Sequence, residues 1–250
     1  ARLQKIQQPT RRDFVFSLRN NSESRKLYIN INPQIYHICF MSSENEARRN
    51  ISIPKQPPMF CMLLRKYLEG CRISDALVIE NERIIEFHFE VMDEFSQKRS
   101  LCLCIELMGK HSNMILYDRE NSVIIGCAHN IGAEKSRYRE LQGGLKYIYP
   151  PKTLTSSSQG RVGAYSLSNE LNKQFENLSQ EQINNYLNSE EFTPAILGNR
   201  YTLFQKLLPN SVAQATVNSM LDNYYSKYQE EMNVNSEKAR LNAVVNPKLK

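Results

Sequence analysis

The sequence predicts an α+β fold in which an antiparallel β-sheet domain comes first and a small helical domain follows. Three observations predict it. Apolar and polar residues alternate in short runs through the first half of the chain, as in strands with one buried face. A single amphipathic helix interrupts these runs near residue 60. After a stretch rich in Ser, Thr, Gln and Gly at 153–163, apolar residues recur at helical spacing.

The strands are expected from their alternation and from the turn residues that separate them. In the run 13–19, two phenylalanines and a leucine share one face. The same pattern predicts further strands at 26–32, 35–41, 85–91, 101–108, 114–117 and 122–127. Residues 1–8 are expected to form a basic entry segment and 42–53 a polar loop.

The clearest helix is expected at 57–70, because Pro57 and Pro58 suit a helix start and Gly70 suits an end. Its apolar face consists of Phe60, Leu63, Leu64, Tyr67 and Leu68. In the second half of the chain, helices are expected at 167–178, 181–187, 201–208 and 213–234. The tail 237–250 is expected to be the stub of a longer helix or coiled coil that Pro247 interrupts.

Composition bounds the class of protein. The chain has 250 residues, of which 41% are hydrophobic and 23% charged, as in soluble globular proteins. Lys and Arg number 32 against 26 acidic residues, which gives a formal charge of +6. This excess favours a polyanionic partner only weakly, and a solvated basic face is the alternative. No apolar run is long enough to cross a bilayer and no signal peptide is visible, so we expect a cytoplasmic protein without a membrane partner.

Cysteine and histidine spacing gives little support for a metal site. Six cysteines occur without a Cys-x-x-Cys pair, which predicts buried reduced thiols and not a zinc cluster or a disulfide framework. In the strand 85–91 the apolar residues point to the core, which places Glu86, His88 and Glu90 on the other face. These three could form half a metal site, but the opposite strand offers no second histidine at a readable spacing. We therefore predict no metal and no cofactor.

The stretch 101–118 is expected to be a β-hairpin with a polar turn at 109–113. The turn is not a phosphate-binding loop, because the upstream glycine and the Gly-Lys-Ser/Thr sequence are missing. His111 and Ser112 are adjacent and lack a third orienting group, so they do not form a nucleophile pair. A structural turn is favoured over a catalytic loop, and no enzyme activity is predicted.

Two further segments are candidates for nucleic-acid contact. Arg137 and Arg139 flank Tyr138, a mixture that single-stranded nucleic acid favours, although tyrosines in such a loop also serve to pack it down. Glu82 and Arg83, taken alone, have the character of an ordinary solvated pair.

Several segments of the chain resemble a known family, and this resemblance strengthens the candidates for nucleic-acid contact. The segments that carry it are PPMFCMLLRKYLEG at 57–70, ERI at 82–84, IELMGKHSNMILYD at 105–118, RELQG at 139–143 and YIYPP at 147–151. In this order they resemble the NFACT-N family, the bacterial RqcH group that was long labelled fibronectin-binding protein A and has eukaryotic NEMF-type relatives.

The resemblance implies a fold and a domain organisation. It implies a β-sandwich-like domain at 1–152, similar to the N-terminal domain of formamidopyrimidine-DNA glycosylases. A helix-hairpin-helix-like region at 166–232 and the start of a coiled coil at 233–250 would follow. Because the chain begins at Ala1 and the family's N-terminal helix and NFACT-R domain are missing, we expect a fragment of a longer protein.

The resemblance also implies a function: a ribosome quality control factor that binds tRNA, alanyl-tRNA above all, and the stalled large ribosomal subunit. It would support the C-terminal alanine tailing of stalled nascent chains, with the peptide bond made by the ribosome. The family's Asp-Arg pair, needed to recruit tRNA, falls on Glu82 and Arg83, and glutamate lengthens the acidic arm. Arginine suits bidentate contact with phosphate, with Glu82 orienting it. Further candidates for tRNA contact are Lys110, His111, Arg137 and Arg139.

Two alternatives remain open. The family's older name suggests a fibronectin-binding adhesin, for which fibronectin would be the partner. The implied fold suggests a glycosylase-like DNA-binding domain, but the glycosylase's amino-terminal proline nucleophile and zinc finger have no counterpart here.

Overall fold

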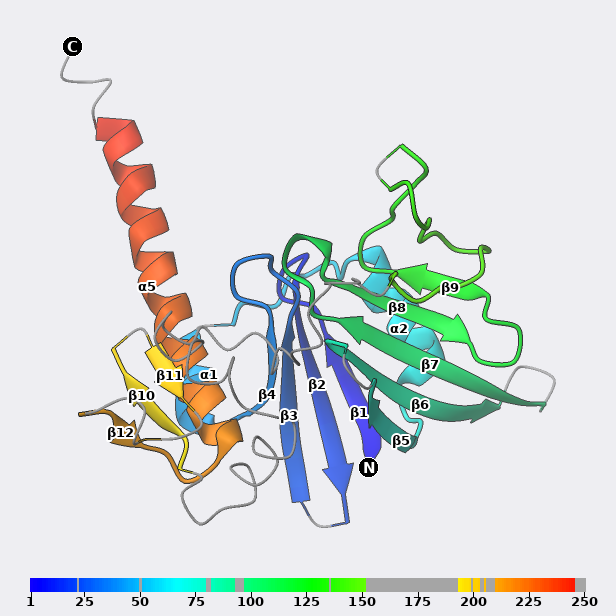
Figure 1. The fold of residues 1–250 in the computed structure, drawn as a ribbon, viewed down its shortest axis with the longest axis horizontal. Helices are drawn as coiled ribbons and strands as arrows, with labels where there is room; N and C mark the ends of the chain where they lie inside the picture. The colour runs from blue at the N-terminus through cyan, green and yellow to red at the C-terminus, as the bar shows by residue number, and fades with distance from the viewer. Residues whose placement is uncertain are drawn as a thin grey trace, which may run out of the picture. The chain divides into compact units, whose positions relative to one another are not determined.

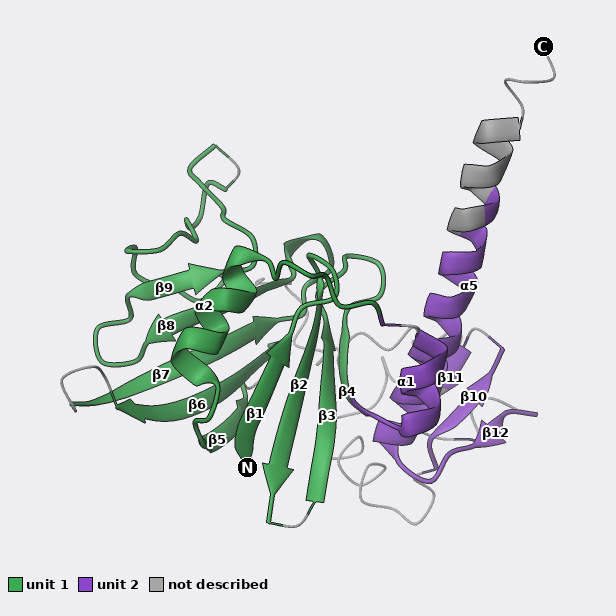
Figure 2. Ribbon diagram, turned by 180° about the vertical axis from the view of Figure 1, so that it is seen from behind, with its two compact units in different colours: residues 1–39, 52–158 green, residues 40–51, 159–250 purple. Residues whose placement is uncertain are grey.

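The structure is a computed structural model. It describes residues 1–21, 23–49, 51–79, 82–92, 97–134, 136–151, 193–198, 200–202, 205 and 210–245. The chain divides into two compact units, which Figure 2 distinguishes by colour: unit 1 comprises 1–39 and 52–158, and unit 2 comprises 40–51 and 159–250.

Unit 1 is built on two antiparallel sheets (Figure 1). The first has the order β1-β2-β3-β4, with β1 Arg2–Gln7, β2 Asp13–Asn20, β3 Glu23–Asn30 and β4 His37–Met41. The second is a five-stranded meander of β5 Ile73–Val78, β6 Ile84–Met92, β7 Lys98–Glu106, β8 Asn113–Asp118 and β9 Ile124–Cys127. Antiparallel sheets and few helices confirm the predicted α+β class.

Two strands of unit 1 were missed by the sequence prediction. The expected entry segment is strand β1, in which Leu3 and Ile6 are fully buried. A register shift between Leu3 and Lys5 breaks the alternation, because a bulge puts residues three apart on one face. Strand β5 lies at a sheet edge and is largely exposed, so it has no apolar face to detect.

The predicted helix is confirmed as α2, Met59–Leu68, which contacts β1 of one sheet and β6 and β9 of the other. Its buried side chains are Phe60, Cys61, Leu64 and Leu68. Leu63 packs against Gly126 of β9, where an added Cβ would lie 2.8 Å from Leu63 Cδ1. A larger residue at this position would therefore force the Leu63 side chain to move.

Unit 2 contains helix α1, Ser43–Arg49, within the segment that the sequence predicted as a loop. Ser42 Oγ accepts a hydrogen bond from the Asn45 N–H at 3.2 Å, as at a helix N-cap. Glutamates in the first turn and arginines in the last match the helix dipole. The loop prediction was wrong because this short helix is stabilised by caps and charges and has no apolar stripe.

Among the described residues, unit 2 further contains β10 Ala195–Leu197, β11 Arg200–Thr202, β12 Val212–Ala213 and helix α5 Val217–Val245. The helix expected at 201–208 is wrong at its start, where Tyr201 and Thr202 belong to β11. The last expected helix is confirmed, although it begins at Val217 and continues through the expected coiled-coil stub to Val245. The helices predicted at 167–178 and 181–187 lie outside the described residues.

Helix α5 is attached to α1 by a buried carboxylate. Asp222 accepts hydrogen bonds from the Ser42 N–H and from Asn45 Nδ2, both at 2.8 Å, and pairs with Arg49 Nη1 at 2.5 Å. Burial alone would raise the pKa of Asp222, but these hydrogen bonds and the arginine outweigh burial and lower the pKa below its ordinary value.

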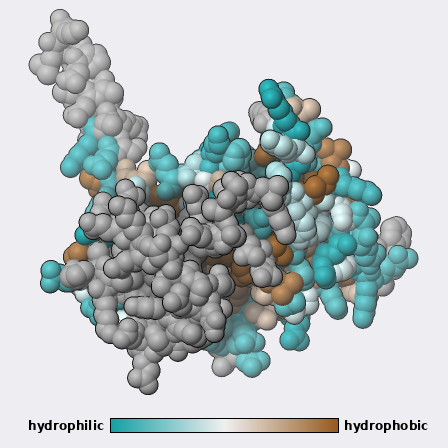
Figure 3. Space-filling view, viewed as in Figure 1, coloured by the Kyte–Doolittle hydropathy of each residue, from teal (hydrophilic) through white to brown (hydrophobic). Residues whose placement is uncertain are grey.

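Hydrophilic side chains cover much of the coloured surface in Figure 3, and apolar side chains break it up in separate patches. All six cysteines are free and five are buried, which confirms the predicted reduced thiols. None of the helices in the described ranges is long and apolar enough to span a membrane.

Candidate functional site

The connections of unit 1 at one end of both sheets converge on a small basic surface (Figure 1), which we call the loop end. It comprises residues 8–12, 31–36, 82–83 and 107–112. The Ile31 N–H donates to the Arg12 carbonyl and the Leu107 N–H to the Arg83 carbonyl, both at 2.8 Å. These backbone bonds join segments that are far apart in the sequence.

Arg83 lies exposed at the centre of the loop end, in the turn between β5 and β6. Its Nη1 donates to Tyr36 Oη at 3.0 Å, and its guanidinium carbon lies 5.8 Å from the centre of the Tyr36 ring. Glu82 is half-buried, and its N–H donates to the Ile79 carbonyl at 3.1 Å. Tyr36, not identified from the sequence, is thus the side chain that orients Arg83.

Lys110 and His111 are exposed on a 3₁₀ turn, Gly109–His111, between β7 and β8. Ser112 Oγ accepts from the Met108 N–H at 2.9 Å, which closes the turn. Gly109 has a φ of +59°, and a Cβ added to it would lie 3.9 Å from Tyr36 Cε1, so this turn lies beside the Tyr36 ring. The predicted hairpin is confirmed, and it carries Lys110 and His111 to the same end as Arg83.

The two arginines at 137 and 139 have different environments. Arg137 is exposed, and the neighbouring Tyr138 is 81% exposed. Arg139 is turned inward: its two Nη atoms donate to the Glu106 carboxylate at 2.8 and 2.5 Å, and Nη1 also donates to the Ile148 carbonyl. Its side chain is only 10% exposed, so a phosphate contact would require breaking this buried ion pair.

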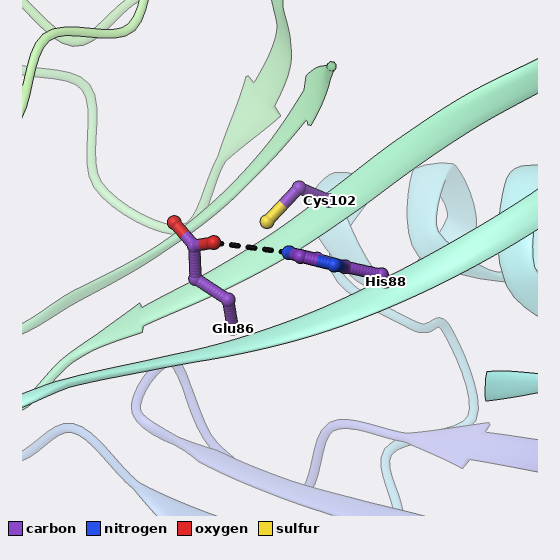
Figure 4. Close-up of side chains that lie close together, drawn as sticks. All are labelled: Glu86, His88 and Cys102. Atoms are coloured by element: carbon purple, nitrogen blue, oxygen red, sulfur yellow. Dashed lines mark hydrogen bonds and ion pairs between the residues drawn. The ribbon is translucent and has the colours of Figure 1, made fainter. Parts of the chain in front are cut away.

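A second polar group lies inside unit 1, on one face of β6 and β7. Glu86, His88 and Cys102 are 4%, 5% and 0% exposed, and Figure 4 shows their side chains turned toward one another. Their ligand atoms all lie within 4.8 Å of one another, and His88 Nε2 is 3.0 Å from Glu86 Oε2.

The expectation that this face of the strand is separate from the core was wrong for Glu86 and His88, although Glu90 is exposed. The segment 128–151 covers the face. Tyr149 Oη and Tyr117 Oη both donate to Glu86 Oε1, the latter at 3.1 Å. Burial would raise the pKa of Glu86, but these hydrogen bonds and His88 lower it.

Tyr147 extends this hydrogen-bonded network toward the loop end. Its ring stacks on Tyr117 with centroids 4.6 Å apart, and its hydroxyl donates to Glu106 at 2.8 Å. Tyr147 and Tyr149 therefore pack the segment 128–151 down on the sheet, as the alternative interpretation of this loop expected, whereas Tyr138 is exposed.

Sequence reasoning overlooked Cys102 because it searched for a second histidine. Cys102 is the direct cross-strand partner of His88 in the β6–β7 ladder. The signal was present, since Cys102 and Cys104 alternate on a predicted strand, but the register was needed to place Cys102 opposite His88 and Cys104 opposite Glu86. Burial raises the pKa of the Cys102 thiol to about 12, so without a bound cation the thiol keeps its proton.

Comparison with known proteins places the chain in a family. The family described as NFACT N-terminal and middle domains matches residues 1–185. The chain belongs to this family. The family predicted from the sequence is thereby confirmed.

Relatives of this NFACT chain include two curated bacterial proteins named Rqc2 homolog RqcH. The one from Streptococcus suis is 34% identical over 183 residues, which are 73% of this chain and 31% of the relative. The one from Bacillus subtilis is 35% identical over 153 residues, which are 60% of this chain and 25% of the relative. The chain thus spans less than a third of the length of either relative.

A solved structure shares the fold. It is the N-terminal part of the fibronectin/fibrinogen-binding protein from Streptococcus suis, with a TM-score of 0.72 and 28% identity. The match covers 90% of this chain and 92% of that chain.

Proposed function

We propose that this chain is the N-terminal part of a ribosome quality control factor and that its loop end contacts tRNA. The single observation that carries the proposal is the exposed Arg83 guanidinium, held over the Tyr36 ring among other cations. The other exposed basic side chains of the loop end are Arg11, Arg12, Lys110 and His111. The names of the two bacterial relatives support the cellular process.

The physical case rests on preorganisation. An arginine presents a planar fork of donors that matches a phosphate or a base edge. Tyr36 restrains the guanidinium through one hydrogen bond and the face of its ring, which lowers the entropy that binding must remove. One donor is used on Tyr36, and the guanidinium has further donors for a ligand.

The residues proposed to contact tRNA are chosen by their exposure and their position. Arg83, Lys110 and His111 belong to one surface, and Arg137 is a further exposed cation on the segment 128–151. Glu82 acts through the turn that presents Arg83. Arg139 is assigned to the interior, where it holds Glu106.

The remaining parts of the proposal follow from the family. The factor acts in the cytoplasm on the stalled large ribosomal subunit, with alanyl-tRNA as the recruited ligand for alanine tailing. The ribosome forms the peptide bond, so this chain needs no catalytic group. The likeness to the glycosylase N-terminal domain stays a prediction about fold, with no DNA chemistry proposed.

The test is tRNA binding to the chain across a salt series, with Arg83→Ala and the matched control Arg19→Ala. Arg19 is also an exposed arginine, and it lies on β2 at the end of the sheet away from the loop end. We expect Arg83→Ala to weaken binding about tenfold and to lower the salt slope by about one, as for a lost phosphate contact. Arg19→Ala should change affinity less than about twofold, since it removes only diffuse charge. Equal losses in the two variants would overturn the assignment.

A second candidate is fibronectin binding, favoured by the name of the Streptococcus suis protein whose N-terminal structure shares this fold. The same variants separate it. Binding of fibronectin at physiological salt that is indifferent to Arg83→Ala, with no tRNA binding, would support adhesion and remove the tRNA proposal.

A further inference from the structure

The buried group formed by Glu86, His88 and Cys102 offers three different kinds of ligand atom in one place. Glu86 and His88 are two residues apart on β6, so both point to the same face, and Cys102 lies opposite His88 on β7. Figure 4 shows the three side chains converging from these two strands. A sheet ladder holds such a set more rigidly than a loop does.

We propose that Glu86, His88 and Cys102 bind a divalent cation of the zinc type. The site is independent of the loop end and of the proposed tRNA contact. One carboxylate oxygen, one imidazole nitrogen and one thiolate sulfur make a mixed donor set that zinc accepts, whereas calcium and magnesium take oxygen ligands. Metal bonds of about 2.0–2.3 Å place tetrahedral ligand atoms about 3.3–3.8 Å apart. The three atoms here all lie within 4.8 Å of one another, and His88 Nε2 is 3.0 Å from Glu86 Oε2, which is close to that spacing.

Charge favours the same occupant. Binding removes the proton of the Cys102 thiol, which goes to solvent, and breaks the hydrogen bond between His88 Nε2 and Glu86 Oε2. The imidazole proton moves from Nε2 to Nδ1, which leaves the Nε2 lone pair for the metal. Thiolate and the Glu86 carboxylate then balance the two positive charges of the cation. A neutral site is the arrangement that a buried position tolerates best.

The surroundings supply an outer shell. Tyr117 and Tyr149 both donate to Glu86 Oε1, so they fix the carboxylate while Oε2 faces His88. Hydrogen bonds of this kind orient a metal-binding carboxylate. When the cation enters between Oε2 and Nε2, the tyrosine bonds persist, and the fourth tetrahedral position takes water. Tyr149 is 44% exposed, so the cluster lies one side chain away from solvent.

The competing explanation is a hydrogen-bonded network that needs no metal. To distinguish the two, the 250-residue chain is freed of metal with a chelator and titrated with Co²⁺, a spectroscopic substitute for zinc. We expect a thiolate-to-cobalt charge-transfer band in the near ultraviolet and its loss when Zn²⁺ displaces Co²⁺. Absence of the band at saturating Co²⁺ would leave only the hydrogen-bonded network and overturn the proposal.

Variants test which residues hold the ion. Cys102→Ser should abolish the band, and the matched control Cys127→Ser, which removes another buried thiol of the same sheet, should retain it. Tyr149→Phe alters a half-exposed side chain, so it should fold normally and bind Co²⁺ about tenfold more weakly. Zn²⁺ should raise the Tm of the wild type and of Cys127→Ser. Loss of the band in Cys127→Ser with retention in Cys102→Ser would refute the site.

Discussion

Arg83 and Arg139 lie near the same end of the second sheet but have opposite environments. Arg83 is exposed and rests on the Tyr36 ring, whereas Arg139 is 10% exposed and is bound by both oxygens of Glu106. The sequence proposed both as tRNA contacts. An arginine can contact a ligand only where its protein partner leaves guanidinium N–H donors facing solvent. A carboxylate that accepts hydrogen bonds from both Nη atoms does not leave them free.

The largest effect is expected when the buried arginine is replaced. Arg139→Met leaves the fully buried Glu106 without its cation, and we expect a loss of about 3–5 kcal/mol in the free energy of unfolding. Urea unfolding at constant slope measures it. Arg137→Met, two residues away and exposed, should cost less than about 0.5 kcal/mol. Equal midpoints for the two variants would contradict a structural role for Arg139.

A third arginine, Arg49 of unit 2, extends the comparison to pH. The folded-state pKa of its partner Asp222 is lowered, so the pair's contribution to stability is complete above the unfolded-state pKa. It is lost as pH falls through the lower folded-state pKa. Below about pH 4, the unfolding midpoint of the wild type should therefore fall more steeply than that of Asp222→Asn, which cannot titrate. Parallel pH profiles for the two proteins would show that Asp222 is not coupled to folding.

The smallest effect concerns the support of the exposed arginine. Tyr36→Leu removes both the ring and the hydroxyl below Arg83, and we expect tRNA affinity to fall about threefold. Tyr36→Phe keeps the ring and should cost about twofold. The control is Tyr67→Leu on α2, a tyrosine that also lies under a cation, with Lys66 Nζ 5.6 Å from its ring centre. A loss in Tyr67→Leu as large as in Tyr36→Leu would argue against a specific role for Tyr36.

Alternation predicted the regular strands, because one residue in two must be buried wherever a sheet covers a core. It failed at β1, where a bulge moves Leu3 and Ile6 out of alternation. The sequence prediction also failed at helix α1, because the stability of this helix comes from a cap and from Asp222, a residue far away in the sequence.

The residues of the candidate site also divide into those that the sequence predicted and those that only the fold brings together. Arg83 could be predicted from the sequence because it lies in a segment that resembles the family. Tyr36 lies 47 positions earlier in the chain, and only the fold brings it into contact with Arg83. The pairing of His88 with Cys102 required the strand register, which periodicity alone does not supply. The inward turn of Arg139 likewise depended on Glu106, which the sequence marked only as one polar position of a strand.

The cover formed by the segment 128–151 has a consequence for the order of folding. Its attachment points, Glu86, Glu106 and Tyr117, are presented by β6, β7 and β8, and they face one side only once these strands have paired in register. Neighbouring hairpins form from local contacts, so we expect them early in folding, with docking of the cover last. On unfolding the order is reversed, so the cover should be the first part to open. Its amide protons should therefore exchange with solvent before those of the strands beneath it.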